Sequence, residues 1–196
     1  LAAYQCLPQL KSHSAAALYT GVTPLELREA IYSCMPFIGC PKTLNAISAV
    51  NDTFTAQGIS LPIEGAERVS EDERMEAGRK IQESIYGTEI RDEFSSLPEP
   101  FNREVPDMLT GWYFGDFCTR GVLDAKTREL LSLVLLAALG AEKQLGAHVS
   151  GCLKAGATQE EIYNALLHAL PYMGFPLGVN AIRIARQRLE APGDAR

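Results

Sequence analysis

Residues 124–140 read DAKTRELLSLVLLAALG, and their spacing predicts a helix that buries one broad face. Asp124 is a favourable N-cap, and Gly140 can end the helix because glycine enters left-handed conformations without a Cβ penalty. No alternating strand pattern occurs elsewhere in the sequence, so the predicted fold class is all-α. Apolar residues recur at the three- and four-residue steps of a helix at Leu130, Leu131, Val134, Leu135 and Ala138.

A segment of 35 residues occurs twice in the chain. Residues 13–47 align without a gap on residues 148–182, at an offset of 148 − 13 = 135. Twelve of the 35 positions are identical, so we predict two copies of one helical module. The identities are His13 with His148, Leu18 with Leu153, Gly21 with Gly156, Thr23 with Thr158, Glu26 with Glu161, Ala30 with Ala165, Pro36 with Pro171, Gly39 with Gly174, Pro41 with Pro176, Asn45 with Asn180, Ala46 with Ala181 and Ile47 with Ile182.

The repeated residues suit a helical module and set its boundaries. In each copy a glycine can end one helix, a Thr-x-x-Glu capping box can start the next, and a Gly-x-Pro turn leads into a third. Leu1 aligns with Leu136, so the first copy lacks the helix at 124–140, and we expect N-terminal residues to be missing. The predicted organisation is a partial first module at 1–56, a linker at 57–71, a complete second module at 72–191 and a tail at 192–196.

Composition and charge limit the possible partners. The net charge is -6 and the basic residues are scattered, which disfavours a nucleic-acid partner. No apolar run approaches the roughly 20 residues of a membrane span. The five cysteines form no Cys-x-x-Cys pair, which indicates free thiols and a cytoplasmic protein. Three separated histidines and no glycine-rich phosphate motif predict neither a metal site nor a nucleotide cofactor.

Four segments together resemble the carboxymuconolactone decarboxylase family: residues 124–139, the Leu-Gly-Ala-His stretch that ends at His148, residues 155–162 and residues 172–176. The likeness runs from about residue 71 to residue 189. It implies an alkylhydroperoxidase D-like helical bundle, a homotrimer of two-module chains, and a small-molecule substrate that is an organic acid or a lactone.

The resemblance implies two possible chemistries, of which the first is a thiol peroxidase. That branch carries Cys-x-x-Cys-x-x-x-His, and counting back from His148 places the two cysteines at Ala141 and Gln144. Counting back from His13 in the first copy gives Cys6 and Gln9. A dithiol peroxidase needs both thiols, so the usual route is closed, and a redox protein that uses Cys6 alone stays as an alternative.

The second chemistry is decarboxylation without a cofactor. A carboxylated lactone can absorb the electrons released with carbon dioxide, so the protein needs a cation, an acid and a dry pocket. The resemblance implies Arg128 as the carboxylate clamp, His148 as the proton donor and Glu129 as its orienting partner. It also points to His168 as a further catalytic residue.

Each of these residues also has a purely structural explanation, which for His148 is packing in the core. Arg128 could pair with a surface carboxylate, and Glu129 gains from the dipole at a helix N-terminus whatever its role. His168 has Ser33 as its counterpart in the first copy, which favours a core or interface histidine. A third possibility for the whole chain is a helical scaffold without catalytic activity.

Overall fold

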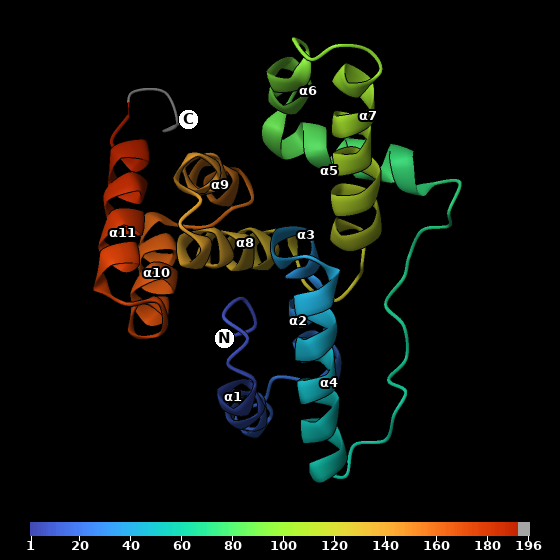
Figure 1. Ribbon diagram of the computed structural model, residues 1–196, viewed down its shortest axis with the longest axis vertical. Coiled ribbons are helices and arrows are strands. Elements are labelled where there is room, and N and C mark those ends of the chain that lie inside the picture. The colour runs from blue at the N-terminus through green and yellow to red at the C-terminus, as the bar shows by residue number, and fades with distance from the viewer. Residues whose placement is uncertain (192–196) are drawn as a thin grey trace. The chain divides into compact units, whose positions relative to one another are not determined.

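The computed structural model describes residues 1–191, and every regular element among them is a helix, which confirms the all-α prediction (Figure 1). The predicted tail at 192–196 lies outside the described residues. The chain forms two compact units. The larger unit contains residues 1–64 and the chain from residue 123 onward, and the smaller unit contains residues 65–122.

The larger unit contains eight helices among its described residues. They are α1 (Leu7–Tyr19), α2 (Pro24–Tyr32), α3 (Met35–Ile38), α4 (Cys40–Ala56), α8 (Ala125–Leu139), α9 (Glu142–Lys154), α10 (Gln159–Met173) and α11 (Phe175–Leu189). Helix α4 contacts α1 and α2, and α11 contacts α9 and α10 in the same relation (Figure 1).

Both ends of α8 form as its sequence predicts. The Asp124 side chain accepts a hydrogen bond of 2.7 Å from the backbone amide of Thr127, and Gly140 is left-handed with φ 67 and ψ 25. One broad face of α8 is buried, as predicted, but it is not centred on the predicted residues, of which Leu130, Leu131 and Val134 are only half-buried. Its most buried residues are Arg128, Glu129, Ser132, Leu133, Leu136 and Ala137.

The aligned segments fold in the same way at their helix ends. Thr23 with Glu26 and Thr158 with Glu161 form complete capping boxes. Gly39 and Gly174 share an unusual conformation, φ 79 and ψ 162 in one and φ 81 and ψ 158 in the other. Shifting α1 by the offset of 135 gives the bounds of α9. These local matches fit the predicted repeat, and the division into two modules stays a prediction.

Two apolar clusters form the core of the larger unit, and their members cross between the copies. The first cluster is built on α8 to α11 and includes Leu133, Val149 and Leu166, and Phe37 from α3 packs against it. The second is built on α1, α2 and α4 and includes Ile31 and Phe54. Leu135 of α8 packs against this second cluster, so α8 contributes to both.

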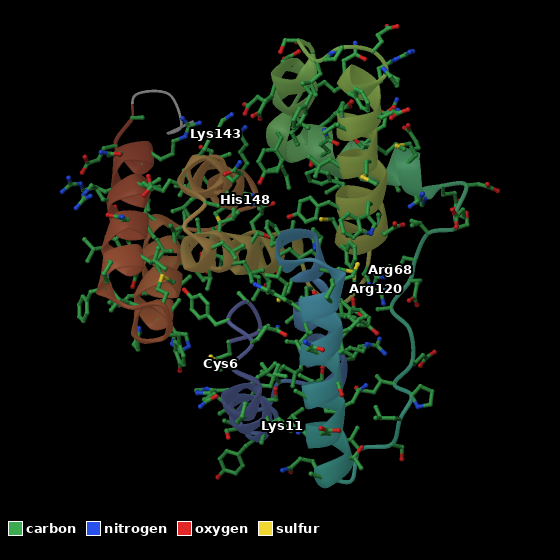
Figure 2. All side chains as sticks on the ribbon, in the orientation of Figure 1. Cys6, Lys11, Arg68, Arg120, Lys143 and His148 are labelled. Atoms are coloured by element: carbon green, nitrogen blue, oxygen red, sulfur yellow. The ribbon has the colours of Figure 1, made fainter. Side chains whose placement is uncertain are left out.

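The smaller unit is built around a close helix pair. Its elements are α5 (Arg74–Tyr86), α6 (Glu89–Phe94), α7 (Phe101–Met108) and the π-helix η1 (Leu109–Cys118). The backbones of α5 and η1 approach so closely that a Cβ on Gly78 would lie 2.6 Å from the backbone nitrogen of Gly115. Arg68 and Arg120 fix the ends of this unit: Arg68 donates to the carbonyl of Gly121, and Arg120 pairs with Glu67 (Figure 2).

Among residues 1–191, no helix combines the length and the apolar character that a membrane crossing requires.

Candidate functional site

The first turns of α8 carry two adjacent buried charged residues. Arg128 is 5% exposed and Glu129 is 3% exposed. Both residues lie near the start of α8, where the Asp124 side chain caps a backbone amide of the first turn. The positive end of the helix dipole there favours the Glu129 carboxylate. Burial on this scale is rare for charged side chains unless they are paired, so both residues call for specific partners.

Glu129 binds the imidazole of His148. His148 belongs to α9 (Figure 2). The Nδ1 atom of His148 lies 2.8 Å from Oε2 of Glu129, and the two side chains are 12% and 4% exposed. A carboxylate at Nδ1 fixes the orientation of the ring and selects the tautomer with its proton on Nδ1. Proton transfer to a substrate would then take place at Nε2.

Arg128 binds Ser33, which comes from the end of α2 in the first copy. Its Nη1 donates to the Ser33 hydroxyl over 2.9 Å, and its Nε donates to the carbonyl of Leu123 over 3.2 Å. The Ser33 hydroxyl in turn donates to the backbone carbonyl of Glu29 over 2.9 Å. The guanidinium is therefore positioned by a residue 95 positions away in the sequence.

The first copy also supplies an aromatic neighbour of the histidine. The rings of Phe37 and His148 lie edge to face, with centroids 5.9 Å apart at 68°. Sequence reasoning did not identify Phe37 or the contact between Ser33 and Arg128. A signal for Phe37 was present, because its counterpart at the offset of 135 is Tyr172, also aromatic.

A second Arg-Glu pair stabilises this part of the first copy. Glu29 is fully buried, and its carboxylate accepts from the guanidinium of Arg28 over 3.2 Å. Arg28 also donates to the carbonyls of Ile63 and Glu64, at 2.7 and 2.6 Å. The Ser33 hydroxyl is bonded to the Glu29 carbonyl, so this pair also stabilises the end of α2 that contacts Arg128.

Three of the four predicted site residues lie together, and His168 does not join them. Arg128 and Glu129 are neighbours on α8, and His148 bonds to Glu129. His168 is exposed on α10 and lines a pocket whose lining contains none of the other three. In the described part of the chain, its ring contact is with Tyr172, at 6.2 Å between centroids.

Two of the five cysteines, Cys34 and Cys152, are unsuited to thiolate chemistry. All five are free thiols in the structure. Burial raises the pKa of Cys34 to about 12, and burial together with the nearby Glu129 carboxylate raises the pKa of Cys152. Both thiols are therefore protonated at neutral pH. Cys6 is half-buried before the first turn of α1, where its sulfur lies 3.9 Å from the Tyr4 carbonyl (Figure 2).

Within residues 1–191, no group of three or more His, Cys, Asp or Glu side chains is arranged to hold a metal ion. The expectation that the protein uses no cofactor stays a prediction.

The fold and the site together define an all-helical protein with a buried carboxylate–imidazole pair beside a buried arginine. The model of the carboxymuconolactone decarboxylase family matches residues 103–187. The chain is 32% identical to the nitrosuccinic acid decarboxylase of Metarhizium robertsii over 112 residues. The aligned residues cover 57% of this chain and 78% of that protein. The chain belongs to the carboxymuconolactone decarboxylase family, as its sequence motifs predicted.

Two further relatives show how widely the similarity extends. The chain is 24% identical over 119 residues to the 4-carboxymuconolactone decarboxylase of Acinetobacter baylyi, covering 61% of this chain and 89% of that protein. It is 40% identical over 82 residues to an uncharacterized 15.0 kDa protein of Paracoccus denitrificans, covering 41% and 60%. Two of these three relatives are named as decarboxylases.

Proposed function

We propose that this protein is a decarboxylase that needs no cofactor and acts on a small carboxylic acid carrying its own electron sink. The observation that carries the proposal is the 2.8 Å bond between His148 and Glu129, nearly sealed from water and next to a buried arginine on the same helix. This set provides an oriented proton donor and a fixed positive charge, which are the two groups that the reaction requires.

The reaction breaks one carbon–carbon bond and forms one carbon–hydrogen bond. When the bond to the carboxylate breaks, carbon dioxide leaves and the electron pair moves into the conjugated carbonyl or nitro group of the substrate. Arg128 stabilises the resulting anion, which is an enolate or a nitronate. His148, protonated on both ring nitrogens, then donates its Nε2 proton to carbon and keeps the proton on Nδ1, and a proton from solvent restores the imidazolium after the product leaves.

The relatives narrow the class of substrate. The substrate types in their names are a carboxylated lactone and a nitro acid. Both types can delocalise an electron pair beside the departing carboxylate, so neither needs an added electron sink. We propose a substrate of this size and kind, an organic acid or a lactone, for this protein.

The test is release of carbon dioxide from 4-carboxymuconolactone and from nitrosuccinic acid. His148→Gln is expected to lower kcat roughly 100-fold, because a positioned general acid contributes on that scale. Glu129→Gln is expected to lower kcat at least roughly tenfold through loss of ring orientation, with a smaller effect on KM. Glu160→Gln, an exposed carboxamide substitution on α10, is the matched control.

Two outcomes would contradict the proposal. Release of carbon dioxide that is unchanged by His148→Gln would remove the imidazole from the mechanism. Absence of release from both compounds, in a protein with an unaltered helical spectrum, would favour the non-catalytic scaffold.

The family resemblance supports a homotrimer of this chain, in which the two predicted modules stand in for the two subunits of a pair. We propose this assembly as the working form of the protein. The paired capping boxes and the equal conformations of Gly39 and Gly174 support the two-module part of the proposal.

A further inference from the structure

The pocket that His168 lines lies in the larger unit, between helices of the two copies. Its volume is about 310 Å³, at the lower end of the range for small-molecule sites. Apolar side chains from α1, α2 and α8 form most of its walls, including Leu10, Ile31 and Leu131. Arg128, Glu129 and His148 do not line it.

This pocket is the counterpart of the candidate site when the two copies are exchanged. At the offset of 135, His13 corresponds to His148, Tyr172 corresponds to Phe37 and His168 corresponds to Ser33. His13, Tyr172 and His168 all line the pocket.

The geometry of two ring contacts supports this equivalence. His13 of the first copy meets Tyr172 of the second edge to face, at 5.3 Å and 79°. His148 of the second copy meets Phe37 of the first edge to face, at 5.9 Å and 68°. Each histidine therefore contacts the aromatic ring that the opposite copy supplies at the same aligned position.

The polar groups of the pocket suit an anion. His13 and His168 are both exposed and both contact the ring of Tyr172, so two imidazoles lie beside the same aromatic ring. No Asp, Glu, Lys or Arg is found among the described residues that line the pocket. The Cys34 thiol there stays protonated because burial raises its pKa to about 12. A ligand anion would therefore meet two imidazole donors and no side-chain carboxylate.

We propose that this pocket binds a small, mostly apolar monocarboxylic acid, with its carboxylate at His13 and His168 and its body against the apolar wall of α8. The ligand is bound and undergoes no reaction, because the pocket lining contains no carboxylate to orient either histidine. This binding is independent of decarboxylation at His148.

The three histidines of the chain make a direct test possible. Protein labelled with ¹⁵N-histidine is expected to give three sets of imidazole NMR signals, which the variants His13→Gln, His148→Gln and His168→Gln assign one by one. Benzoate is the probe, and benzyl alcohol is the neutral control of the same shape. Benzoate at millimolar concentration is expected to shift the signals of His13 and His168 in a saturable way and to leave those of His148 in place.

Calorimetry of the double variant His13→Gln/His168→Gln gives a second readout. Both side chains are exposed, so the variant is expected to fold, and its affinity for benzoate should fall roughly tenfold or more. Equal shifts with benzyl alcohol would overturn the recognition of a carboxylate. Shifts confined to His148, or benzoate binding that the double variant retains, would place the ligand elsewhere and overturn the site itself.

Discussion

Ser33 is a small residue whose hydroxyl makes two hydrogen bonds, one within the first copy and one to Arg128. Its hydroxyl accepts from Arg128 and donates to the carbonyl of Glu29, and it is 6% exposed. A buried hydroxyl with both bonds made is costly to remove, because the groups it served lose a partner in a site with little water.

Ser33→Ala is expected to lower the free energy of unfolding by about 1 to 3 kcal/mol. It should also lower kcat for the substrate acid more than it raises KM, because Arg128, which stabilises the anion formed in the reaction, loses an acceptor that positions its guanidinium. Urea unfolding and steady-state kinetics measure the two effects. Ser12→Ala, on the exposed face of α1, is the control, and equal behaviour of the two variants would show that Ser33 does not position Arg128.

At the scale of helices, the turn between α10 and α11 depends on a conformation that other residues rarely adopt. Gly174 has φ 81 and ψ 158, and a Cβ there would meet its nearest neighbour, Pro176, at an ordinary 3.9 Å. Gly174→Ala is therefore expected to cost about 1 to 3 kcal/mol through backbone strain alone.

Gly146→Ala is the matched control for that substitution. Gly146 is helical in α9, and a Cβ there would lie 3.9 Å from Ile184. Alanine is favoured over glycine in a helix, so this variant should be neutral or slightly more stable. The measurement is the melting temperature of both variants. A Gly174→Ala protein as stable as the wild type would contradict the predicted backbone strain.

The two capping boxes make stability depend on acid pH. Hydrogen bonds from Thr23 lower the pKa of Glu26, and bonds from Lys126 and Thr158 lower the pKa of Glu161, both from an ordinary 4.5. A carboxyl group with a lowered folded pKa stabilises the protein above its unfolded pKa, and this contribution is lost as pH falls through the folded value.

Glu26→Gln/Glu161→Gln is therefore expected to lose less stability than the wild type when the pH falls below about 4.5. The measurement is the melting temperature of each protein across the acid range. Glu160→Gln removes an exposed carboxylate from the same turn as Glu161 and should keep the wild-type profile. Parallel profiles for all three proteins would show that the caps do not carry the acid sensitivity.

Local chemistry explains which parts of the fold could be predicted from sequence. The Asp124 cap, the two Thr-x-x-Glu boxes and the Gly140 terminus each depend on residues within one turn, and all were predicted correctly. The residues that form the buried face of α8 were not predicted correctly, since neighbours from distant segments decide which side of a helix is buried. The 95-residue separation between Ser33 and Arg128 explains why this contact escaped the same reasoning.

At the scale of the whole molecule, the proposed homotrimer has a direct test. A chain of 21.3 kDa should give three times that mass by light scattering coupled to size exclusion. Closed rings of identical subunits use one repeated interface, so the mass should not grow with concentration once the ring is complete. A monomer at working concentrations, or a mass that rises continuously, would contradict the proposal.

Phe37 contacts His148 and Ser33 contacts Arg128, so substitutions in residues 28–37 and in α8 and α9 are expected to depend on one another in evolution. A graft that exchanged the N-terminal helices for those of a relative would also exchange Phe37 and Ser33, which contact His148 and Arg128 of the candidate site. Catalytic behaviour should therefore follow the donor of residues 28–37 as well as the donor of α8 and α9, and chimeras cut between them are expected to resemble neither parent.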